Sequence, residues 1–128
     1  MTTPSVPRIL AIMGSGETAP TMNAPHRAIF ERLGTDVDAV LLDTPFGFQE
    51  NAPILASKAI EYFRDAVGRR VEAAGLTRTD SGDTVAVERG VAKVRSADWV
   101  FAGPGSPTFA LEQWRNTPVP GAIADKLR

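Results

Sequence analysis

The chain has 128 residues, of which 43% are hydrophobic and 23% are charged, and its formal net charge is -1. This composition is typical of one globular domain, and the nearly neutral charge gives no reason to expect nucleic acid or an anionic membrane as a partner. The chain contains no cysteine, which excludes disulfides, thiolate metal ligands and a cysteine nucleophile within it.

The amino terminus and the apolar runs bear on location. Residues 1–8 contain two prolines and lack the apolar stretch of a signal peptide. No apolar run approaches the roughly 18 residues that a membrane helix needs. Together with the absence of cysteine, these features predict a cytoplasmic protein.

The first half of the chain predicts two strands and two helices. Residues 9–13 (Ile-Leu-Ala-Ile-Met) form a continuous apolar run, which is typical of a strand buried on both faces. Asn23 is suited to cap a helix over residues 24–33, and residues 37–43 predict the second strand. Asn51 is suited to cap the second helix.

The end of this second helix is ambiguous. Val71 and Ala74 continue its apolar stripe, yet Gly68 is a natural stop. We favour an end at Gly68 and a short strand over residues 70–76, because a helix that ran to Ala74 would leave the next crossover without a strand.

The second half repeats the alternation. Asp83 is suited to cap a helix, residues 98–102 predict a fourth strand, and Ser106 is suited to cap the helix that follows. Thr117 and Pro118 open a last helix. Alternating strands and helices predict an α/β fold, a three-layer α/β/α arrangement with a mostly parallel sheet.

The sheet has a predicted open edge. If the four strands lie in the order 3-2-1-4, Trp99–Ala102 forms an unprotected apolar edge, which is expected to pair with a second polypeptide or with another copy of the chain as a homo-oligomer, or to aggregate. The last helix ends without the strand that its crossover should feed. We therefore interpret residues 1–128 as the amino-terminal part of a single α/β domain that is truncated.

The loop after the first predicted strand is the first candidate site. It reads G-x-G-x-x-A, a form of the dinucleotide-binding fingerprint, and Asp43 ends the second strand. However, Pro20 and Pro25 interrupt the helix that should meet a pyrophosphate. A tight turn with a solvated glutamate is one alternative. Another is a loop that lines a substrate pocket through Gly14, Ser15, Gly16 and Glu17.

The loop after the second predicted strand offers weaker candidates. Phe46 and Phe48 are expected to pack onto the end of the sheet. Gln49 and Glu50 are candidate substrate-binding residues by position only.

The loop after the fourth predicted strand is the most informative. Gly103 and Gly105 allow close approach of backbone to a ligand, and the amides near Ser106 begin a helix, which suits an anion or a developing oxyanion. The Ser106 side chain itself is expected to cap the helix. It is not expected to be a nucleophile, because no G-x-S-x-G elbow surrounds it.

The chain has one histidine, His26, in the predicted first turn of a surface helix, where we expect it to be exposed to solvent. A Ser-His-Asp triad would have to use it, and no second histidine exists for a metal site. No metal, cofactor or complete catalytic cluster is predicted.

Three segments together resemble a known family. Residues 9–17 (ILAIMGSGE), 44–51 (TPFGFQEN) and 97–111 (ADWVFAGPGSPTFAL) are similar to the amino-terminal half of the peptidase S51 family, the group of dipeptidase E and cyanophycinase. The resemblance implies a flavodoxin-like fold, close to that of class I glutamine amidotransferases. It also implies a serine hydrolase that acts on a small peptide or amide.

In that family the catalytic serine and histidine follow the region that matches residues 118–128. The resemblance therefore implies a chain that supplies pocket residues and an oxyanion loop at Gly103 and Gly105 but is inactive alone. Pro107, and the lack of an asparagine after the glycines, depart from the peptidase pattern. Two alternatives remain: a Rossmann-like module that binds a nucleotide or anion through residues 14–19, and a non-catalytic interaction domain.

Overall fold

The computed structural model describes residues 7–128 and shows a mixed α/β protein. Its strands are β1 (Ala39–Leu42), β2 (Glu72–Ala73) and β3 (Trp99–Ala102). Its α-helices are α1 (Asn23–Leu33), α2 (Ala52–Tyr62), α3 (Thr84–Ser96), α4 (Pro107–Trp114) and α5 (Val119–Asp125). Within the described residues, no helix is both long enough and apolar enough to cross a membrane.

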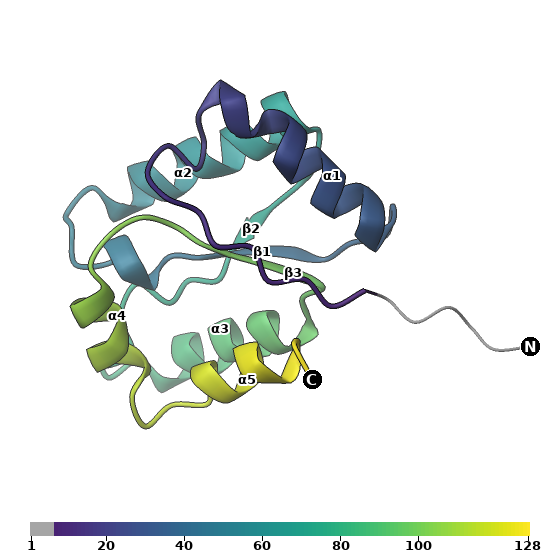
Figure 1. Ribbon diagram of the computed structural model, residues 1–128. Helices are drawn as coiled ribbons and strands as arrows, with labels where there is room; N and C mark the ends of the chain where they lie inside the picture. The colour runs from purple at the N-terminus through teal and green to yellow at the C-terminus, as the bar shows by residue number, and fades with distance from the viewer. Residues whose placement is uncertain (1–6) are drawn as a thin grey trace, which may run out of the picture.

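The sheet is parallel and has the order β2-β1-β3. Residues 9–13, expected between β1 and β3, form no strand, so the predicted order 3-2-1-4 is wrong (Figure 1). The reason is that β3 takes the whole of the adjacent edge of β1, from Ala39 opposite Trp99 to Leu42 opposite Ala102. β3 nevertheless forms one edge of the described sheet, as expected.

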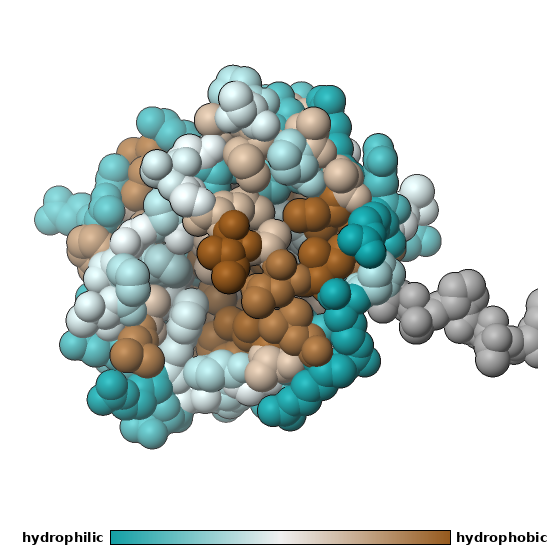
Figure 2. Space-filling model, viewed as in Figure 1, coloured by the Kyte–Doolittle hydropathy of each residue, from teal (hydrophilic) through white to brown (hydrophobic). Residues whose placement is uncertain are grey.

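Residues 9–13, which we call the apolar segment, run outside the sheet without a backbone hydrogen bond to any described residue. The side chains of Leu10 and Ile12 are 68% and 90% exposed. Figure 2, viewed as in Figure 1, shows hydrophobic residues gathered around a hollow on this face. The middle of this apolar run, residues 10–12, is therefore exposed, which is unusual for a folded domain.

Helices cover both faces of the sheet, and β1 alternates between them (Figure 1). Ala39 and Leu41 belong to a core cluster on the side of α1 and α2, whereas Val40 and Leu42 belong to a second cluster on the side of α3 and α5. This alternation follows from the two-residue period of a strand. The continuous apolar run in the sequence thus reflects burial on both faces.

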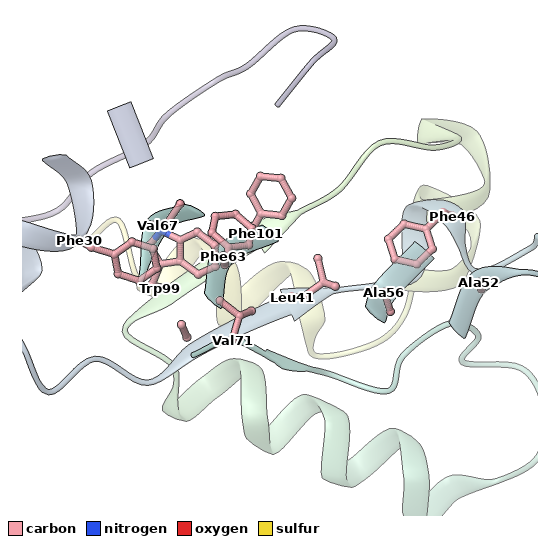
Figure 3. Close-up of a cluster of buried hydrophobic side chains, with 11 residues drawn as sticks. Phe30, Leu41, Phe46, Ala52, Ala56, Phe63, Val67, Val71, Trp99 and Phe101 are labelled. Atoms are coloured by element: carbon pink, nitrogen blue, oxygen red, sulfur yellow. The ribbon is translucent and has the colours of Figure 1, made fainter. Parts of the chain in front are cut away.

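The first cluster is aromatic (Figure 3). Phe30 stacks on Trp99 with ring centroids 4.6 Å apart, and Phe63 meets Trp99 edge-on at 5.0 Å. Phe101 lies parallel to Trp99 on the same strand, at 5.8 Å. Aromatic pairs in these geometries contribute beyond their buried area, so α1 and the end of α2 are fixed onto β3.

The end of the second helix is where we expected it. α2 passes into a π turn, Phe63–Val67, which ends at Gly68 with φ 79°. The expected strand over residues 70–76 is shorter than predicted, because it is confined to β2. Gly75, at φ 76°, turns the chain, and the amide of Leu76 donates to the Asp43 carboxylate instead of extending the ladder.

Two of the four expected helix caps are confirmed. The Asp83 carboxylate accepts from the amide of Ala86 at 3.0 Å, and the Ser106 hydroxyl accepts from the amide of Phe109 at 3.1 Å. Asn51 occupies the N-cap position of α2 as expected, but its side chain makes no capping hydrogen bond. The expected cap by Asn23 is wrong, because Asn23 lies inside α1, where its side chain accepts from the Tyr62 hydroxyl.

Candidate functional site

The loop between β3 and α4 is held by its last residue. The amide of Ser106 donates to the carbonyl of Pro45 at 2.8 Å, and its hydroxyl caps α4. The Ser106 amide is therefore already used within the protein. Of the other amides of this loop, that of Gly105 has no hydrogen bond within residues 7–128, whereas that of Gly103 points toward the Leu42 carbonyl, because Leu42 pairs with Ala102 in the parallel ladder.

A packing reason explains both glycines of this loop. A Cβ on Gly105, whose φ is 150°, would lie 2.0 Å from the carbonyl oxygen of Pro45. A Cβ on Gly103 would lie 3.2 Å from the ring of Phe46. The two loops that follow β1 and β3 thus approach too closely for any other residue at 105. This close approach also sets the position of the Gly105 amide.

Gly103 and Gly105 line a cavity of about 900 Å³ that extends along the whole of β3 and past its carboxyl end. The cavity brings together five residues predicted from the sequence: Gly14, Ser15, Glu17, Gly103 and Gly105. Its remaining walls are largely apolar and include the apolar segment, β3 and parts of α4 and α5. Ligand sites in parallel α/β folds lie at this end of the sheet.

The other predicted site residues lie outside this cavity. Gln49 and Glu50 are exposed in the turn before α2. Of the two phenylalanines expected to pack down, Phe46 is buried as expected, whereas Phe48 is 49% exposed and rests against the ring of Phe109. Gly16 serves a turn, since its carbonyl accepts from the amide of Ala19 at 2.9 Å.

His26 is buried, so the expectation that it is exposed is wrong. Its Nε2 donates to the carbonyl of Glu17 at 2.7 Å, and its ring meets Phe63 edge-on at 5.0 Å. This bond holds the loop of residues 14–18 against α1. No serine or threonine hydroxyl is hydrogen-bonded to His26 in the described part of the chain, so these residues form no catalytic pair.

The geometry that dinucleotide binding requires is not found. α1 begins only at Asn23, after the short 3-10 turn Pro20–Met22, so its N-terminus is remote in sequence from Gly14 and Gly16. Asp43, the acidic residue of the fingerprint, is buried and its Oδ1 accepts from the amide of Leu76 at 2.8 Å. Burial raises the pKa of the Asp43 carboxyl above its ordinary value, although hydrogen bonds from the backbone oppose this.

A smaller cavity of about 210 Å³ adjoins the loops and adds one residue that the sequence did not reveal. It is lined by Glu17, Thr18 and Gly103 together with Lys58 of α2. No motif surrounds Lys58. Only its position in α2, about two turns after Asn51, could have drawn attention to it. Within residues 7–128, no group of three or more potential metal ligands is found.

Both ends of α4 are anchored to other loops. At its start, Ser106 is bonded to Pro45. Near its end, the Gln113 side chain accepts from the amide of Thr79 at 2.7 Å and donates to the Asp80 carboxylate at 3.2 Å. The loop that carries Gly103 and Gly105 is therefore fixed by contacts from two separate connections.

Comparisons with protein-family models, with curated proteins and with solved structures found no match to this chain.

Proposed function

We propose that this chain provides the substrate pocket and the oxyanion loop of a serine-hydrolase type of site that acts on a small peptide or amide. The nucleophile and its base come from polypeptide outside the described residues. The proposal includes a three-layer, class I glutamine amidotransferase-like fold and a cytoplasmic location. The observation that carries it is the Gly105 amide, which has no hydrogen bond within residues 7–128 and belongs to a loop that lines a cavity next to β3.

The chemistry follows from the Gly105 amide. When a nucleophile adds to an amide carbonyl, negative charge develops on the carbonyl oxygen. Backbone N–H groups that are already fixed in place stabilise this charge without reorganisation. The fixed position of Gly105 against Pro45 supplies such preorganisation. The volume and the apolar walls of the cavity suit a small organic substrate.

Measurements of binding test the pocket, and measurements of hydrolysis test whether the nucleophile lies outside the described residues. Small blocked dipeptide amides, added to the isotopically labelled chain, should shift the NMR signals of Gly14, Gly103 and Gly105 without being hydrolysed. Shifts confined to other regions, or none up to millimolar concentration, would contradict the pocket. Hydrolysis that survives both Ser106→Ala and His26→Ala would contradict the division of labour.

A matched pair of variants localises the binding. Gly14 and Gly121 both have open space where a Cβ would be added, and neither has a positive φ. Gly14→Leu places a side chain at the cavity, so it should weaken binding at least fivefold. Gly121→Leu changes α5 outside the cavity and should leave binding unchanged. Equal effects of the two would argue against this site.

The open edge of β3 favours one second candidate, a non-catalytic interaction domain. β3 pairs only with β1 among residues 7–128, and an unpaired edge is a template for another strand. Sedimentation over a concentration series tests this. Reversible association would favour the interaction domain, and a monomer at high concentration would argue against it.

A further inference from the structure

The outer edge of β3 borders an apolar groove. Along β3 one edge of the backbone is bonded to β1, and within the described chain the other edge has no strand beside it. The cavity of about 900 Å³ extends along this free edge. Apolar side chains line it on both sides: Ile29 and Leu33 from α1, and Leu111, Trp114, Ile123 and Leu127 from the α4–α5 region.

The apolar segment lies at this groove and matches it. Its five residues are apolar without interruption, and they line the same cavity in part. They run beside β3 in the same direction (Figure 1). Five extended residues span about 16 Å, enough to accompany the four residues of β3.

The side chains of the apolar segment also alternate in their surroundings. Ile9 and Met13 are half-buried, and Met13 packs against the first core cluster. Leu10 and Ile12, which point the other way in an extended chain, are exposed. A strand placed on β3 would turn Leu10 and Ile12 toward the groove side that carries Leu111 and Leu127.

We propose that the apolar segment docks onto the outer edge of β3 as a fourth, parallel strand, giving the order β2-β1-β3-segment. Docking satisfies the free backbone groups of β3 and buries Leu10 and Ile12 together. Because the segment is tethered to α1, its effective concentration at the edge is high, which favours it over a second copy of the chain. Docking also fixes Gly14 and Ser15 next to Gly103 and narrows the cavity. The inference does not depend on the proposed function.

Hydrogen exchange measured by NMR tests the docked strand. The undocked segment has no backbone hydrogen bonds, so its amides should exchange at the rates of an unstructured chain. Docking predicts at least tenfold slower exchange at alternate residues of the segment, at a level independent of protein concentration. Exchange at unstructured rates would overturn the proposal. Protection that rises with concentration would also overturn it, because a second copy would then be the partner.

Two substitutions of exposed isoleucines complete the test. Ile12→Ser should abolish the protection of the segment while the amides of β1 keep theirs, which shows that the protein remains folded. Ile54→Ser, at a residue of α2 that is 56% exposed, is the control and should leave the segment's protection unchanged. Retention of protection in Ile12→Ser would overturn the docked arrangement.

Discussion

Asp38 and Asp98 bind each other at the start of two neighbouring strands. The amide of Asp38 donates to the Asp98 carboxylate at 2.9 Å, and the amide of Asp98 donates to the Asp38 carbonyl at 2.8 Å. The pair brings β1 and β3 together before either strand begins. It thereby helps to make them direct neighbours, without room for a strand between them.

Removing this carboxylate should weaken the junction of β1 and β3. Asp98→Ala leaves the Asp38 amide without its partner, so we expect a loss of about 1 kcal/mol in unfolding free energy, since the site is exposed to solvent. Urea denaturation measures it. Asp36→Ala, at a nearby exposed aspartate, should change stability by less than about 0.5 kcal/mol. Equal losses in the two variants would show that the Asp38–Asp98 bond contributes nothing specific.

Asp43 should make stability depend on pH. Its pKa in the folded protein is raised above the ordinary value of 3.8, chiefly by burial, so the folded state holds the proton more tightly than the unfolded state. This contribution is fully present below pH 3.8 and is lost as the pH rises through the folded pKa. The amide side chain of the variant Asp43→Asn does not ionise, so its unfolding free energy does not decrease in this way as the pH rises.

The measurement for Asp43 is urea denaturation of both proteins from pH 4 to pH 7. The unfolding free energy of Asp43→Asn minus that of the wild type should increase with pH over this range. Other titrating groups cancel in the difference, because both proteins contain them. A difference that stays constant or decreases would contradict a raised pKa.

The two-loop contact at Gly105 should tolerate no side chain. In Gly105→Ala the Cβ would overlap the Pro45 carbonyl, so we expect the bond from Ser106 to Pro45 to break, at a cost of about 2 kcal/mol or more. Gly121→Ala, in α5 with open space around the new atom, should instead gain about 0.5–1 kcal/mol from helix propensity. Thermal unfolding of both variants checks the opposite signs. Stability unchanged in Gly105→Ala would mean that the loops separate at no cost.

His26 should hold the loop of residues 14–18 in place. His26→Phe preserves an aromatic ring among Tyr62, Phe63 and Phe101 but removes the bond to the Glu17 carbonyl. We expect a loss of about 1 kcal/mol in unfolding free energy. Hydrogen exchange should become faster at the amide of Ala19, whereas the amides of α4 should be unaffected. Unchanged exchange at Ala19 would place the anchoring of this loop elsewhere.

Local features of the fold were predictable from the sequence. The caps by Asp83 and Ser106 and the helix end at Gly68 depend on residues within one turn, so short-range rules identify them. β1 and β3 were also predictable as buried strands, because their apolar runs are short and bounded by turn residues.

The arrangement of these elements in space was not predictable in the same way. The apolar segment has as strong a strand pattern as β1, yet the choice of neighbour for β1 depends on side-chain packing of Trp99 with Phe30 and on the Asp38–Asp98 bonds. The burial of His26 was missed for the same reason. Its partners, Glu17 and Phe63, come from other parts of the chain, and a proline before it suggested only an exposed first helical turn.

The candidate site was predictable in outline only. Glycine-rich loops after strands pointed to Gly14, Gly103 and Gly105, which the structure gathers at one cavity. Which amides stay unbonded depends on the contact of Ser106 with Pro45, between loops far apart in sequence. No local pattern in the sequence encodes that contact.

The double anchoring of α4 has a consequence for engineering. The eight-residue helix α4 is held at Gln113 by Thr79 and Asp80. Its opposite end adjoins the loop of Gly103 and Gly105. Lengthening the connection around residues 77–82 would shift α4, and with it both the loop of Gly103 and Gly105 and the part of the cavity wall formed by Ala110 and Leu111. Variation of this connection therefore changes the shape of the cavity from residues that do not line it.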